Sequence, residues 1–304
     1  MFDLARTLRT HHGVCTTAQL TASGLGRHAI AAAVRQGRLE RAYRGMFVDP
    51  GLPLEVRRAV RVGGRLSCIS AAGLHGLRVL NPPEVLHVAV AADASRLRTP
   101  RAPESPVRLH WTGGPGFDAT PIAPLEQVLA DVLGCVPELD ALCVLDSARE
   151  QVAWQTDPPM LGDEAFARLV ARLPGHLRVV AHRSTTASQS VGETIARVRF
   201  EGSGIPVQPQ VALPGGVHAD LLIGERLVFE VDGEAPHSLP GAFDRDRGRW
   251  AWLKAAGYAH VSFSHRQVVH EWDSVGATVR MLVRRGEHLW SARPNSGAER
   301  GLAW

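Results

Sequence analysis

Three carboxylates lie on or beside two short apolar runs in the C-terminal third of the chain. The runs, residues 219–223 and 227–231, have the composition of β-strands on either side of a turn. The acids are Asp220, Glu230 and Asp232. A carboxylate on a buried strand is costly unless it is paired, protonated or bound to a cation. The pattern therefore indicates an oxygen-lined site for Mg²⁺ or Mn²⁺, or, as the simpler alternative, a solvated acid that starts a turn at Asp232-Gly233.

The register of the two strands decides whether Asp220 and Glu230 can share a cation. Side chains alternate along a strand, and residues directly opposite in an antiparallel pair share a face. A two-residue turn at 224–225 would place Asp220 opposite Phe229 and send the two acids to opposite faces. A three-residue turn over 224–226, or a one-residue bulge, places Asp220 opposite Glu230. We expect this second arrangement, with Phe229 buried on the other face.

A longer ordered pattern runs through residues 188–285. It consists of Ser190-x-x-Glu193, Asp220, Glu230-x-Asp232-Gly233, His237, Phe243, Asp246, Arg249, Leu253 and Gly257. This order resembles the PD-(D/E)xK, or restriction-endonuclease-like, nucleases, and most closely the domains related to very-short-patch-repair endonucleases. The resemblance implies an αβββαβ core and DNA phosphodiester hydrolysis that depends on Mg²⁺ or Mn²⁺.

The resemblance also assigns roles to residues. Glu193, Asp220 and Glu230 would bind the metal, and Glu193 should lie within a few ångströms of the other two. Asp232 would add a ligand or orient the attacking water. His237 would act as a general acid or base, or hold the phosphate, unless it is an ordinary loop histidine.

Three positions depart from the family pattern. Asp232 stands where the superfamily has its lysine, Trp250 where relatives usually have an acid, and Ser262 where they often have arginine. These departures bear on catalysis more than on fold. They leave open an alternative function, a non-catalytic regulator that uses the nuclease fold as a scaffold.

The first 50 residues have the pattern of a DNA-binding module. Helical spacing over 2–11, a helix capped near Thr16 and ending by residue 24, and a helix over 27–36 precede an alternating ribbon at 38–48. This succession is typical of a winged helix-turn-helix, and the segment resembles the N-terminal domain of AbiEi-type antitoxins of abortive-infection systems. The resemblance implies an antitoxin-like transcriptional repressor with a toxin partner, and a neighbouring nucleotidyltransferase gene would favour this function.

In a winged helix the second helix of the motif enters the major groove and the wing follows the backbone. We expect Arg27 and His28 at base edges. Phosphates would be contacted by Arg35, Arg38, Arg41 and Arg44. The alternative is a protein-interaction domain whose arginines are only solvated.

Charge is distributed unevenly along the 304 residues. Residues 1–70 hold 11 arginines against four acids, residues 71–189 carry −3 and residues 190–304 are neutral. A basic first quarter favours double-stranded DNA as a partner, because phosphate neutralisation supplies most sequence-independent affinity. No apolar run approaches the ~20 residues that span a bilayer, so we expect no membrane association and a cytoplasmic location.

The sequence thus predicts a mixed α/β chain of four parts. These are a winged helix-turn-helix at 1–50, a connector at 51–187, a restriction-endonuclease-like domain at 188–288 and a tail at 289–304. The connector carries helical and strand patterns but no recognisable chemistry. The four cysteines have no Cys-x-x-Cys spacing, which indicates neither a zinc ribbon nor a disulfide framework, and we expect reduced core residues.

Overall fold

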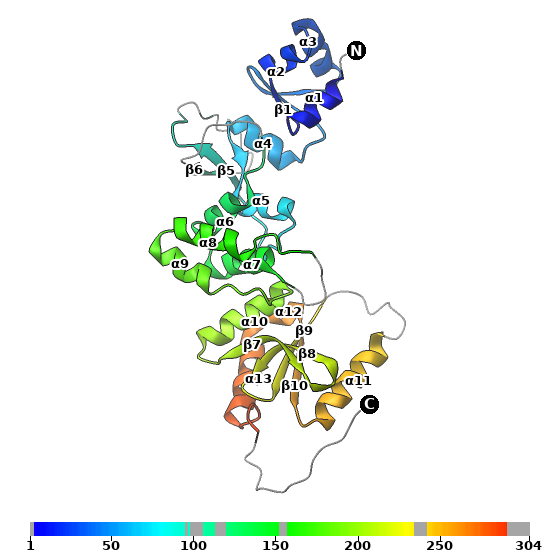
Figure 1. Ribbon diagram of the computed structural model, residues 1–304, viewed down its shortest axis with the longest axis vertical. Helices are drawn as coiled ribbons and strands as arrows, with labels where there is room; N and C mark the ends of the chain where they lie inside the picture. The colour runs from blue at the N-terminus through cyan, green and yellow to red at the C-terminus, as the bar shows by residue number, and fades with distance from the viewer. Residues whose placement is uncertain are drawn as a thin grey trace. The chain divides into compact units, whose positions relative to one another are not determined.

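The chain folds as two compact units in a computed structural model that describes residues 3–94, 97, 106–112, 120–151, 157–233 and 242–290, with only the backbone of 242–246. One unit is Met1–Arg149 with Pro158–Ser184, and the other is Glu150–Asp157 with Thr185–Trp304. Figure 1 shows helices and small sheets in both, so the predicted mixed α/β class is confirmed. None of the described helices is long and apolar enough to cross a membrane.

The N-terminal segment of the first unit has the predicted three helices and ribbon in order, with the short strand β1 as an addition. The elements are α1 (Leu4–Thr10), β1 (Val14–Thr16), α2 (Thr17–Ala22), α3 (Arg27–Arg35), β2 (Glu40–Tyr43) and β3 (Met46–Val48). The strands form an antiparallel sheet in the order β1-β3-β2. Thr16 starts α2 through a reciprocal capping box with Gln19. Leu20, Ile30 and Phe47 belong to one apolar core that the helices and this sheet share. Because α3 buries Ile30 in this core, the opposite face of the helix is exposed.

The rest of the first unit surrounds a second sheet. Its elements are α4 (Leu54–Val62), β4 (Arg65–Leu66), α5 (Cys68–Ala72), the 3₁₀ turn Gly73–His75, β5 (Leu86–Ala91), β6 (Val107–Thr112), α6 (Leu125–Leu133), α7 (Glu138–Arg149), α8 (Asp163–Arg172) and α9 (Gly175–His182). The sheet order is β4-β5-β6, with β6 parallel to β5. Apolar side chains from these strands and helices form one continuous core.

The second unit contains the predicted αβββαβ succession. It runs α10 (Val191–Gly202), β7 (Val207–Leu213), β8 (Val217–Ile223), β9 (Leu227–Asp232), α11 (Ala242–Ala255) and β10 (Ala259–Ser264), followed by α12 (His265–His270) and α13 (Trp272–Arg284). The sheet order is β10-β9-β8-β7. Strands β7, β8 and β9 are antiparallel, whereas β10 is parallel to β9. A parallel neighbour needs a crossover, and α11 supplies it.

The register of the β8–β9 hairpin agrees with the prediction. Leu222 pairs with Val228 and Ile223 with Leu227, so three residues form the turn. The same register places Asp220 across from Glu230. The backbone ladder stops one pair earlier, and the Val231 N–H donates instead to Oδ2 of Asp220 at 2.9 Å. Where β8 and β9 separate, the Asp220 carboxylate therefore accepts a backbone N–H of β9 that a carbonyl of β8 would accept if the ladder continued.

Candidate functional site

Glu193 lies in the first turn of α10 and is buried. Ser190 caps the helix by accepting the Glu193 N–H at 3.1 Å. Oε2 of Glu193 accepts the Gln189 N–H and the Gln210 side-chain amide, both at 3.0 Å. These contacts fix the carboxylate at the end of the sheet, and they also give the Ser190-x-x-Glu193 pattern an ordinary role in starting a helix.

Asp220 has a strongly raised pKa. Its pKa is raised to about 7, mainly by burial and to a smaller extent by the charges of Glu193 and Glu230, while the Val231 N–H and Arg249 act to lower it. The effects of Glu193 and Glu230 show that the three predicted acids are electrostatic neighbours. At neutral pH Asp220 is therefore divided between its protonated and charged forms.

Glu230 is buried on β9 and already has two partners. Its Oε1 lies 2.5 Å from the Arg249 guanidinium of α11, and its Oε2 lies 2.8 Å from Nε2 of His260 on β10. Arg249 also donates to the His218 carbonyl of β8. A buried carboxylate is tolerable when a cation neutralises it, and here the protein supplies that cation itself.

Asp232 lies at the exposed end of β9 and accepts a hydrogen bond from the Ser262 hydroxyl. A pocket of about 510 Å³ opens beside this pair. It is lined by Trp250, Lys254, Tyr258, His260 and Ser262. Lys254 is the only lysine of the chain, and it offers this pocket a cationic group. His237 lies outside the described residues.

The three predicted metal ligands do not form a ready-made cation site. Among the residues that the structure describes, the one compact set of three or more histidine, cysteine and carboxylate ligand atoms lies in the other unit. Glu230 faces Arg249 and His260, and Glu193 holds two amide donors. A divalent ion here would have to displace these partners.

The six predicted DNA-contacting residues are all exposed. They are Arg27, His28, Arg35, Arg38, Arg41 and Arg44. Arg27 and His28 form the first turn of α3, and Arg44 lies in the turn between β2 and β3. Arg41 lies over the Phe47 ring, with its guanidinium carbon 5.6 Å from the ring centroid. The start of α3 and the β2–β3 ribbon thus both expose arginine side chains to solvent.

The ribbon is attached to α4 by an ion-pair network. Glu40 accepts hydrogen bonds from the guanidinium groups of Arg57 and Arg61, each at 2.6 Å. Burial acts to raise the pKa of Glu40, but hydrogen bonds from the two guanidiniums hold that pKa below its usual value. Two of the N-terminal arginines, Arg57 and Arg61, therefore have a structural role that the exposed arginines of α3 and the ribbon do not share.

Sequence reasoning missed a group of possible ligands in the connector, namely Cys68, His87, His110 and Cys135. They come from four separate elements, and no two are close in sequence. The usable signal was a histidine inside each of two strand-like runs, His87 and His110, which local spacing could not connect to the cysteines.

The arrangement of α2, α3 and the β2–β3 ribbon is that of a winged helix-turn-helix, a class of nucleic-acid-binding module. Residues 3–48 match the family model described as a transcriptional regulator, AbiEi antitoxin. The match confirms the AbiEi-type resemblance of this N-terminal segment. A search of curated proteins returned no match to the chain.

Proposed function

We propose that this protein is a DNA-binding transcriptional regulator that contacts duplex DNA through α3 and the β2–β3 ribbon. The observation that carries the proposal is the exposure of all five arginines and of His28 in α3 and the ribbon, on the segment that matches the AbiEi regulator family. The N-terminal residues of α3 would approach base edges, and the ribbon arginines would neutralise phosphates.

The test is the salt dependence of duplex binding by the full-length protein, measured by fluorescence anisotropy. Changing Arg38, Arg41 and Arg44 together to alanine should lower the slope of log Kobs against log[salt] by about three, because each lost phosphate contact releases about one counterion fewer. Affinity for all sequences should fall alike.

The matched control changes three exposed arginines of α13 and its end, Arg280, Arg284 and Arg285, to alanine. Net charge falls by the same amount, and the slope should stay near that of the wild type. Equal losses in the two triple variants would mean that net charge, not the ribbon, drives binding, and would contradict the proposed surface.

A toxin is the protein partner that this proposal implies, since the matching family is described as an antitoxin. Co-expression with the product of an adjacent nucleotidyltransferase gene, followed by co-purification, tests the pairing. Growth that is arrested by the partner alone and restored by this protein supports it. Unrelieved arrest contradicts it.

A second candidate function is metal-dependent phosphodiester hydrolysis in the C-terminal unit. It is favoured by the register that places Asp220 across from Glu230 and by the raised Asp220 pKa beside two further acids. A bound Mg²⁺ or Mn²⁺ would displace the Asp220 proton and polarise the phosphodiester. Lys254, in the adjoining pocket, would attract the phosphate.

The test is nicking of supercoiled plasmid with Mg²⁺ and with Mn²⁺. Activity that Asp220→Asn abolishes, and that Asp273→Asn at an exposed acid of α13 leaves intact, supports hydrolysis. Activity that is absent, or equal in both variants, leaves the regulator as the function, with Arg249 occupying the cation's place beside Glu230.

A further inference from the structure

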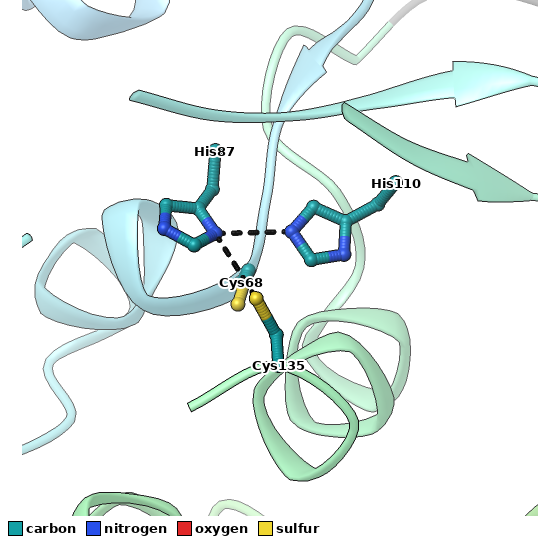
Figure 2. A group of neighbouring side chains, drawn as sticks. All are labelled: Cys68, His87, His110 and Cys135. Atoms are coloured by element: carbon teal, nitrogen blue, oxygen red, sulfur yellow. Dashed lines mark hydrogen bonds between the residues drawn. The ribbon is translucent and has the colours of Figure 1, made fainter. Parts of the chain in front are cut away.

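The first unit brings two cysteines and two histidines together at one point. One ligand atom from each of Cys68, His87, His110 and Cys135 lies within 4.8 Å of all the others. Nδ1 of His87 is 3.0 Å from Nε2 of His110 and 3.7 Å from Sγ of Cys135. Figure 2 shows both rings directing a nitrogen toward each other above the two sulfur atoms.

The sheet register explains why the histidines meet. Strands β5 and β6 are parallel, and His110 pairs with Ala89. Ala89 and His87 are two residues apart on β5, so both histidines lie on one face of the sheet. The two rings are stacked, with their centroids 5.3 Å apart.

Helices supply the sulfur atoms. Cys68 is the first residue of α5, and Cys135 follows the end of α6. Cys68 has a φ of 52°, a left-handed conformation that is uncommon outside glycine. Such strain persists only where the surrounding structure enforces it, and here it accompanies a thiol placed against the histidines.

The four groups satisfy one another poorly on their own. The two ring nitrogens that face each other at 3.0 Å can share only one proton, and a thiol is a weak donor.

We propose that Cys68, His87, His110 and Cys135 bind one Zn²⁺ ion. Bond lengths of about 2.0–2.1 Å to nitrogen and about 2.3 Å to sulfur place the ligand atoms of a regular tetrahedron about 3.3–3.8 Å apart. The separations of 3.0 and 3.7 Å are close to this range. The two negative charges of the thiolates would balance the charge of Zn²⁺, so the complex with two neutral imidazoles has no net charge, which suits a partly buried site.

Neighbouring polar groups complete the environment of these ligands. Asp131 of α6 places Oδ1 3.8 Å from Nδ1 of His110, and its Oδ2 accepts the Ser67 hydroxyl at 2.6 Å. The negative charge of this carboxylate would favour a proton on Nδ1 of His110, which leaves Nε2 free for the metal. Arg108 donates to Sγ of Cys135 at 3.5 Å and would offset thiolate charge.

The site would be structural. Four protein ligands close the coordination sphere and leave no position for a substrate, in contrast to catalytic zinc. The ion would join α5, β5, β6 and α6, elements that are far apart in sequence. Binding free energy would then contribute directly to the stability of this unit.

The test uses the full-length chain purified with added zinc and dialysed. Elemental analysis should find one zinc per chain, and Co²⁺ substitution should give the intense visible absorption of a tetrahedral thiolate site. Cys135→Ala should lose the metal, whereas Cys143→Ala, at a buried cysteine of α7 outside the group, should keep it. Metal content below one-tenth per wild-type chain, or equal loss in both variants, would overturn the site.

Two further measurements keep the test decisive if Cys135→Ala does not fold. Asp131→Asn keeps all four ligands, and it should weaken zinc affinity by about 10–100-fold. In the wild type, alkylation should modify Cys68 and Cys135 only after a chelator is added. A disulfide between these two cysteines in the metal-loaded protein, or alkylation that ignores the chelator, would contradict the proposal.

Discussion

Asp220 shows how one residue couples the acid cluster to pH. An aspartate in an unfolded chain has a pKa of about 3.9. In the folded protein burial, together with Glu193 and Glu230, raises the Asp220 pKa to about 7. Between these two values the folded state keeps a proton that the unfolded state has lost. The free energy of unfolding therefore falls as pH rises from about 4 to about 7, and stays lower above that window.

Asp220→Asn should remove this dependence, because an amide carries no charge and can still accept the Val231 N–H. At pH 8 the free energy of unfolding of the variant should exceed that of the wild type by about 1–3 kcal/mol, and at pH 4 the two should be nearly equal. The gain at pH 8 is smaller than the full pKa shift implies, because solvent screens a half-buried group. Urea unfolding at pH 4, 6 and 8 measures this. Asp273→Asn is the control, and a gain that is constant with pH would contradict the argument.

The residues of the candidate sites were predictable where their signal is local. The acids stand out because a carboxylate interrupts an apolar strand, and the α3 and ribbon arginines because the buried face of that segment is uniformly apolar. The sequence left open whether Arg249 pairs with a carboxylate or reaches DNA, and it did not indicate His260, since these partners of Glu230 come from α11 and β10. Their positions depend on the crossover geometry, which spacing does not encode.

At the scale of elements, periodicity and caps located most helices and strands. The bounds of α8 and β7 agree with their patterns because each begins and ends at clear breaks: Gly162 and Leu173-Pro174 for α8, Pro206 and Pro214 for β7. Apolar runs at 85–91 and 107–111 also predict the strands β5 and β6. The role that these two strands share was not predictable, because their parallel pairing depends on the tertiary structure.

Two short helices, α9 and α12, were not predicted. Helix α12 starts directly after β10, and Ser264, the last residue of that strand, also caps the helix by a reciprocal bond with Gln267. Helix α9 begins with Gly175, a poor helix former, just after Pro174. In both cases packing against neighbouring elements overrides a weak local preference.

At the scale of the whole molecule, charge and packing separate the two units. The first 70 residues carry +7, whereas residues 190–304 are neutral. Each unit also has its own apolar core, one around the β5–β6 sheet and one around β8, β9 and α11. A regulator that binds DNA through its N-terminal segment does not require the acid cluster to be a nuclease, because these features belong to different cores.

Because each unit has its own core, we expect a destabilising substitution in one unit to leave the stability of the other unchanged. Gly224 in the β8–β9 turn has a φ of +63°, and a Cβ there would lie 2.5 Å from the His288 carbonyl oxygen. That oxygen accepts the N–H groups of Glu225 and Arg226 at 2.7 and 3.2 Å. Gly224→Ala should therefore cost about 1–3 kcal/mol through backbone strain, and the collision adds to it.

Hydrogen exchange followed by mass spectrometry should show where this cost appears. In Gly224→Ala, exchange should accelerate in β7, β8, β9 and β10, because their protection depends on the stability of their own cooperative unit, while β5 and β6 exchange at the wild-type rate. The control is Gly248→Ala on α11, where a Cβ meets no atom within 4 Å and alanine is the better helix former, so exchange there should slow or stay unchanged. Equal acceleration in β5 and β6 would show that the two units unfold as one.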